Sequence, residues 1–155
     1  MTAALKQPYQ GDAYSILTDT ELGSLAANAY SALSAAEFNV ADQGQVLRDL
    51  ELVLAAQAAN RTENSVAIYV VPSIDGTNYV DWDAGGTAVN QANETYYAGS
   101  FTVNDTELVA VRAGVASVVI PWGGKFKIAV RNLTGQAFAA TGNTVKGRRH
   151  GYQSQ

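Results

Sequence analysis

The chain has 155 residues, of which 47% are hydrophobic and 15% are charged, with a formal net charge of −4 and no cysteine. These values suffice for one domain with a buried core, and they exclude a global basic field for nucleic acid or an anionic membrane. Disulfides and thiolate metal sites are excluded as well. Because the charged fraction lies below the usual value of about a quarter, we expect partners to cover part of the surface.

Residues 1–20 are polar and are expected to form an extended N-terminal arm. Tyr9, Tyr14 and Ile16 are its candidate contacts with a partner, and a mobile terminus is the alternative. The start of the chain lacks the positive-then-apolar pattern of a secretion signal. No apolar run approaches the roughly 18 residues of a membrane span, so we expect neither export by such a signal nor a membrane partner.

Residues 22–59 fit the sequence pattern of a helix as well as that of a strand. The Ala-rich segment 24–33 favours a helix by propensity. Leu47, Leu50 and Leu54 have helical spacing, whereas Leu50, Leu52 and Leu54 alternate as in a strand. The pattern of residues leaves this choice open.

Strand signals are clearer after residue 64. Alternating segments at 66–71 and 97–103 each predict a strand, and residues 144–152 fit a last strand or a tail. The Val-rich segment 107–120 is interrupted at Gly114, which predicts two strands or one bulged strand. Regular short strands separated by turn residues predict an all-β sandwich or jelly roll.

The strictest alternation lies at 125–131. Phe126, Ile128 and Val130 predict a dry face, and the intervening positions predict a wet face: Lys125, Lys127, Ala129 and Arg131. Turn residues flank the segment on both sides, so we expect a half-buried antiparallel strand.

The long polar loop at 73–93 offers two kinds of site. Asp75, Asp81 and Asp83 are candidate calcium ligands, but their order does not match an EF-hand loop. The alternative is a solvated loop in which Asp75-Gly76 makes a turn. We expect no metal site.

Aromatic residues near turns offer a surface for a ligand. Trp82 and Trp122, with Asp75 and Tyr79, are candidate contacts for a sugar or receptor. They are equally suited to anchoring a protein interface or to closing the end of a sandwich.

The basic segment near the C-terminal end suggests a different kind of contact. Arg148 and Arg149 are candidate contacts with an acidic neighbour, and a solubilising tail is the alternative. The single histidine, His150, and the lack of a base–nucleophile set predict that the chain is not an enzyme and binds no cofactor.

Four stretches resemble a family of small virion proteins of tailed bacteriophages, some of which are capsid decoration (cement) proteins. They are IYVVPSIDGTNY at 68–79, YAGSF at 97–101, GKFKIAVRNLTGQAF at 124–138 and ATGNTVK at 140–146. The resemblance implies a jelly-roll-like sandwich assembled on a virion, and it favours strands in residues 22–59. This chain departs from the family pattern at 121–124, where it has PWGG in place of Pro-Pro-Gly, and in its basic end.

These observations predict an extended arm at 1–20, a β-sandwich at 21–147 and a basic tail at 148–155. The first hypothesis is a capsid decoration protein, made in the host cytoplasm and located on the virion, that binds the major capsid protein as a homotrimer and binds no nucleic acid. The alternative is a virion-surface module that binds a carbohydrate or a receptor.

Overall fold

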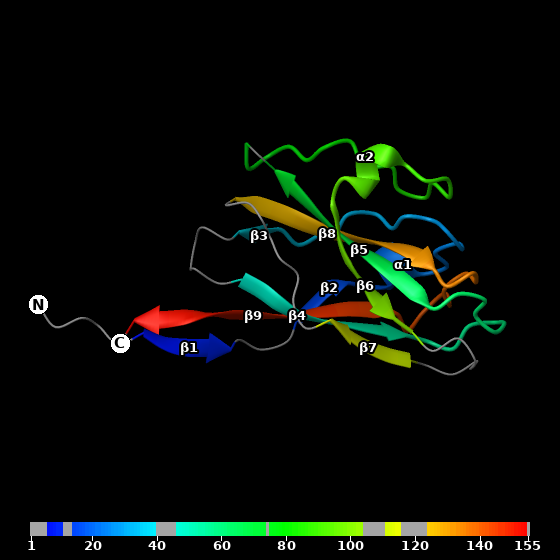
Figure 1. Ribbon diagram of the computed structural model, residues 1–155, viewed down its shortest axis with the longest axis horizontal. Coiled ribbons are helices and arrows are strands. Elements are labelled where there is room, and N and C mark those ends of the chain that lie inside the picture. Colours follow the sequence, from blue (N-terminus) through cyan, green and yellow to red (C-terminus); the bar gives the residue numbers. More distant parts are fainter. Residues whose placement is uncertain are drawn as a thin grey trace, which may run out of the picture.

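The chain folds into two antiparallel sheets that pack face to face (Figure 1). The computed structural model describes residues 6–10, 14–39, 46–73, 75–103, 111–115 and 124–154. The first sheet contains β1 (Lys6–Gln10), β2 (Tyr14–Leu17), β4 (Val46–Leu54), β7 (Val111–Val115) and β9 (Thr144–Ser154). The second contains β3 (Phe38–Asn39), β5 (Ser65–Ser73), β6 (Tyr97–Thr102) and β8 (Lys125–Leu133). Two short helices, α1 (Asp19–Leu22) and α2 (Gln91–Glu94), lie in the connections.

The order of the strands is that of a jelly roll. Counted from β2, the strands pair from the outside of the sequence inwards. The pairs are β2 with β9, β3 with β8, β4 with β7, and β5 with β6. Pairing of β4 with β9 and of β5 with β8 completes the two four-stranded sheets. This nested pairing defines an eight-stranded jelly roll, to which β1 adds a further strand. The predicted all-β, jelly-roll-like antiparallel sandwich is confirmed.

The core lies between the sheets and is built from alternate residues of the central strands. Alternate residues at 50–54 of β4, 66–70 of β5 and 126–130 of β8 face inward, and the edge strands and α1 close the core. The largest side chains of the core are Ile16, Leu17, Leu22, Phe38, Leu50, Leu52, Leu54, Ile68, Phe101, Phe126, Ile128 and Phe138. The predicted strand at 66–71 and the predicted dry face of Phe126, Ile128 and Val130 are therefore confirmed.

The predicted wet face of β8 is wrong in part. Lys125 and Lys127 are half-buried, but Ala129 is 0% exposed and Arg131 is 8% exposed. The reason is that two segments, 28–34 and 75–96, cover the outer face of the second sheet. Beneath them, Ala129 joins Ala67, Tyr69 and Val71 of β5 in a second hydrophobic cluster. Residues 66–71 of β5 and 128–132 of β8 are thus buried on both faces of the sheet.

A β-bulge changes the expected pattern of β6. The register with β5 shifts between Ile68 and Tyr69, which pair with Gly99 and Tyr97. The extra residue reverses the faces beyond it, because side chains alternate along a strand. Phe101 is therefore buried, whereas Tyr97 is 53% exposed.

The described residues between α1 and β4, 23–39, form neither a helix nor a long strand. Residues 28–34 run beside β8 with a single bridge, from Tyr30 to Arg131. The amides of Ser31 and Ser34 donate to the carbonyls of Val130 and Ile128 in β8. Their hydroxyls accept hydrogen bonds from the same strand, Ser31 from Val130 N (3.0 Å) and Ser34 from Ile128 N (3.1 Å). Side-chain acceptors thus replace a regular ladder here.

The structure decides two choices that the sequence leaves open, between helix and strand near Leu50 and between one and two strands around Gly114. Residues 46–54 form β4, with Leu50, Leu52 and Leu54 buried, so the strand template is the correct one. Gly114 does not end a strand but lies inside β7, opposite Glu51. The rest of 107–120 lies outside the described residues.

β9 is longer than its neighbours and leaves the sandwich. β4 pairs with it as far as His150, and among the described residues β1 is the strand that pairs with 151–154. Figure 1 shows β1 and β9 extending from the body as a two-stranded ribbon, which we call the β1–β9 ribbon. The boundary expected between 147 and 148 falls inside β9, and the segment expected as an arm contains both β1 and β2 of this sheet.

Candidate functional site

Residues 75–96, which we call the cap, cover part of the outer face of the second sheet. The cap runs over β5 and β8 and includes α2 (Figure 1). Its side chains Tyr79, Val80, Trp82 and Tyr96 pack against the second cluster, whose fully buried members include Tyr30 and Tyr69. This aromatic contact area joins the cap to the outer face of the second sheet.

One carboxylate oxygen joins the cap to the sheet. Oε1 of Glu94, at the end of α2, accepts hydrogen bonds from the hydroxyls of Tyr30 (2.5 Å) and Tyr69 (2.9 Å) and from Nη1 of Arg131 (3.2 Å). Arg131 also donates from Nε to the carbonyl of Asn28 (3.0 Å), and its guanidinium lies 4.7 Å from the centre of the Tyr30 ring. We call Tyr30, Tyr69, Glu94 and Arg131 the Glu94 cluster.

The two phenols of the Glu94 cluster are held in their protonated form. Burial, and then the hydrogen bond to Glu94, raises the pKa of Tyr69 far above its ordinary value. The same two causes, in the same order, raise the pKa of Tyr30. Both hydroxyls are therefore fixed donors, which suits holding the cap in place.

Trp82 and Tyr79 are engaged within the chain. Nε1 of Trp82 donates to the carbonyl of Ser31 (2.7 Å), and its ring packs edge-on against Tyr30 at 5.6 Å. The Tyr79 ring lies beneath Nζ of Lys127 at 4.8 Å, and burial, followed by the charge of Glu37, raises the pKa of Tyr79 to about 12. Both side chains fix the cap, and Trp122 lies outside the described residues.

Asp75 forms the turn that Asp75-Gly76 predicts. Its carboxylate accepts bonds from the amides of Thr77 (2.9 Å) and Asn78 (2.7 Å), and Gly76 has a φ of 74°. These backbone bonds lower the pKa of Asp75 well below its usual value, with the carboxylate on the surface. Within the described part of the chain, no group of three or more His, Cys, Asp or Glu side chains is placed to hold a metal ion.

The candidate partner contacts of the arm and the basic end have separate positions. Ile16 is 3% exposed and belongs to the core, so in this structure it offers no surface to a partner. Tyr9 pairs with Gly151 in the β1–β9 ribbon, and Tyr14 pairs with Gly147 in the body of the sheet. The side chains of both tyrosines lie outside the described part of the structure.

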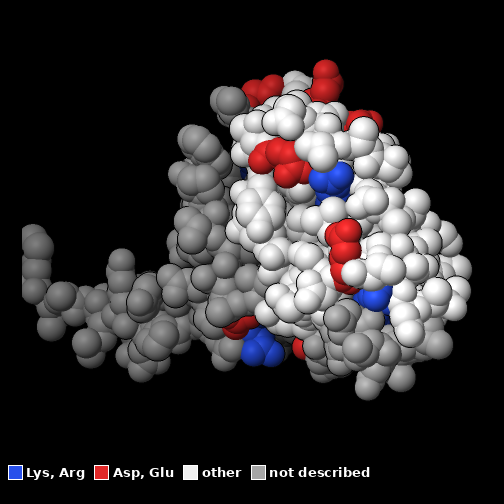
Figure 2. Space-filling view, turned by 45° about the vertical axis from the view of Figure 1, so that its right-hand side comes forward, with Lys and Arg blue, Asp and Glu red and all other residues white. Residues whose placement is uncertain are grey.

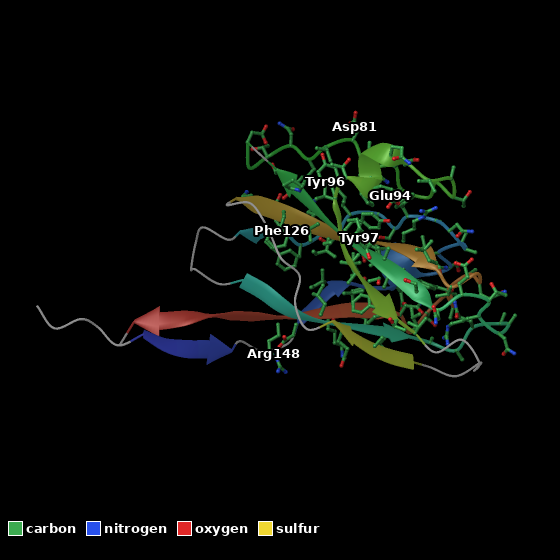
Figure 3. The ribbon with its side chains drawn as sticks, in the orientation of Figure 1. Asp81, Glu94, Tyr96, Tyr97, Phe126 and Arg148 are labelled. Carbon is green, nitrogen blue, oxygen red and sulfur yellow. The ribbon has the colours of Figure 1, made fainter. Side chains whose placement is uncertain are left out.

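The two arginines lie on β9. Arg148 is opposite Asp49 of β4, on a half-buried position of the first sheet (Figure 3). An opposite charge directly across a ladder stabilises the pairing of strands. Arg149 is opposite Leu47, and its side chain lies outside the described part of the structure.

Sequence patterns give little sign of the Glu94 cluster. Arg131 occupies an expected wet position of β8, and nothing in the spacing of Tyr30 or Glu94 relates them to it. The usable signal is Asn90, a helix-capping residue type whose side chain accepts bonds from the amides of Ala92 and Asn93 at the start of α2. That signal predicts a helical turn in the loop but not its contact with the sheet.

Comparison with known proteins adds little to the fold. No protein-family model and no curated protein matches the chain. Among solved structures, a chain of turnip yellow mosaic virus is similar over 100% of this chain and 84% of that one, with 14% identity and a TM-score of 0.37. A TM-score of this size does not establish a shared fold, so the order of strands defines the class. No helix in the described ranges is long and apolar enough to span a membrane.

Proposed function

We propose that the chain is a structural protein of a tailed-phage virion and, more specifically, a capsid decoration protein. It would bind the outer capsid surface and bridge neighbouring major-capsid subunits, as a homotrimer. The resemblance at 68–79 and 124–138 supports this role. Jelly rolls are common in capsid and lectin domains, so the fold agrees with the proposal without deciding it.

The observation that carries the proposal is the β1–β9 ribbon. Its outer part, residues 6–9 with 151–154, is paired within itself but lacks a third strand among the described residues. A two-stranded ribbon alone is at best marginally stable in water, so such an element gains most of its order from a neighbour. An edge of this kind can add to a strand of a coat subunit through backbone hydrogen bonds.

The charges of β1 and β9 are unevenly placed along the ribbon. The two strands contain four of the ten Lys and Arg residues and no Asp or Glu, but Lys146, Arg148 and Arg149 lie where β9 pairs with β4, and Lys6 is the basic residue of the outer part. Figure 2 shows that much of the described face is uncharged. We therefore expect backbone hydrogen bonds to dominate the contact with the coat protein, with modest single contacts multiplied by many copies.

The test is binding to particles that lack the protein. Truncation must stop before Tyr14, because Leu17 is 0% exposed and its removal would damage the core. We expect the full chain to co-sediment with undecorated capsids, and the variant without residues 1–12 to lose at least about tenfold in affinity while keeping its circular dichroism spectrum. Equal binding by the truncated variant would refute the role of the ribbon, and no binding by the full chain would refute the decoration role.

A further inference from the structure

Tyr97 is unusual among the large hydrophobic side chains of the described residues. Only Tyr97, at 53%, and Val89, at 58%, are classed as exposed there. The bulge in β6 turns Tyr97 away from the core, and its ring packs edge-on against Tyr69, with centroids 6.0 Å apart and planes at 72°. This contact fixes the ring while leaving more than half of the residue accessible.

Glu94 has one oxygen that is not used by the Glu94 cluster. All three donors contact Oε1, and no described residue donates a hydrogen bond to Oε2. The Glu94 side chain is 30% exposed. Because three donors immobilise the carboxylate, Oε2 is a preorganised acceptor at the surface.

Tyr69 places these two groups next to each other. Its hydroxyl contacts the carboxylate of Glu94 at 2.9 Å, and its ring contacts that of Tyr97. Tyr69 and Tyr97 are also paired residues of β5 and β6, so the arrangement rests on the sheet. Figure 3 shows Glu94 and Tyr97 near one another at the junction of α2 and β6.

We propose that Tyr97 and Oε2 of Glu94 form a binding subsite for a neutral pyranose sugar. An exposed, immobilised aromatic ring can pack against the C–H face of a sugar, and a fixed carboxylate oxygen accepts bonds from its hydroxyls. The ion pair of Glu94 with Arg131 offsets the negative charge, which favours a neutral ligand over a cation. This subsite differs from the surface of Asp75, Tyr79, Trp82 and Trp122 expected from the sequence, and it does not depend on the decoration role.

The test uses saturation-transfer difference NMR on the full chain. The probes are the methyl glycosides of glucose, galactose, mannose, rhamnose and N-acetylglucosamine, with choline as the cationic probe. The variants are Tyr97→Ala, which removes the ring, and Tyr97→Phe, which keeps it. Val89→Ala is the matched control, because it truncates the other exposed hydrophobic side chain.

We expect at least one glycoside to give a signal on its ring protons, and Tyr97→Ala to weaken its binding by about tenfold or more. Tyr97→Phe and Val89→Ala should keep the binding. No signal from any glycoside, a signal that survives Tyr97→Ala, or a signal from choline alone would overturn the proposal. Binding of the Tyr97→Ala variant to capsids should be unchanged, which separates this subsite from the ribbon.

Discussion

Replacing Glu94 with alanine tests how the cap is attached to the sheet. The change removes the acceptor of the Tyr30 and Tyr69 hydroxyls and the charge partner of Arg131, whose side chain is 9% exposed. A hydrogen bond to a charged group contributes about 1.5–3 kcal/mol, and removing one partner of a buried ion pair costs about 3–5 kcal/mol. These terms overlap, and Glu94 is 30% exposed, so we expect a loss of about 3 kcal/mol in the free energy of unfolding.

The measurement is urea unfolding, followed by tryptophan fluorescence and by far-ultraviolet circular dichroism to check that the two transitions coincide. Glu94→Gln keeps an oxygen acceptor and should lose about half as much, because the charge alone is removed. Glu63→Ala is the control, since Glu63 is an exposed carboxylate outside the cluster, and it should change stability by less than about 0.5 kcal/mol. A loss below about 1 kcal/mol for Glu94→Ala would refute the role of the cluster as the main attachment of the cap.

Three further predictions concern the cap and the core. The folded pKa of Tyr79, about 12, exceeds its ordinary value of 10.0, so its contribution to stability is complete below pH 10 and is lost as the pH rises towards 12. This would be contradicted if an ultraviolet titration of the folded chain showed every tyrosine ionising at its ordinary pH. Phe101→Ala should cost about 3–5 kcal/mol in urea unfolding, since Phe101 is 0% exposed, and a cost below about 1 kcal/mol would place it outside the core. Trp82→Phe removes the bond to the Ser31 carbonyl and should cost about 1 kcal/mol and change the near-ultraviolet circular dichroism; an unchanged spectrum would show that Trp82 is not packed in the cap.

The pattern of residues predicts the inward faces of this fold well. Alternation at 126–130 identifies side chains that meet between the sheets, because only side chains at every second position point towards the core. The same rule cannot foresee what covers the outer face. Arg131 follows the polar rhythm of β8, yet long-range contacts with Glu94 and with the carbonyl of Asn28 bury it.

Local patterns also miss features that depend on the register between strands. The alternation around Tyr97 does not reveal the bulge that turns it outward, because Phe101 and Tyr97 have the same parity, and Gly99, which lies next to the register shift with a φ of 155°, is the residue that signals it. Helix propensity at 24–33 is overridden by hydrogen bonds with β8, in which the amides of Ser31 and Ser34 donate to that strand and their hydroxyls accept from it. The resemblance to phage virion proteins correctly favours a strand at β4, but it does not indicate that β9 continues to Ser154 as part of a ribbon.

The ribbon is the feature on which the proposed role depends most. Its backbone pairing is set by β1 and β9, and Lys6 is the basic residue of its outer part. A decoration protein of this design would hold its jelly roll above the capsid and insert the ribbon at the contact between coat subunits. The Glu94 cluster would keep the cap closed at the opposite sheet.

Electron cryomicroscopy of the particle that carries this protein tests that arrangement most directly. The account predicts jelly-roll density on the outer capsid, with residues 6–10 and 150–154 lying against coat subunits and with Tyr97 facing away from the contact. A particle without such density, or a jelly roll attached through another surface with its ribbon in solvent, would contradict it.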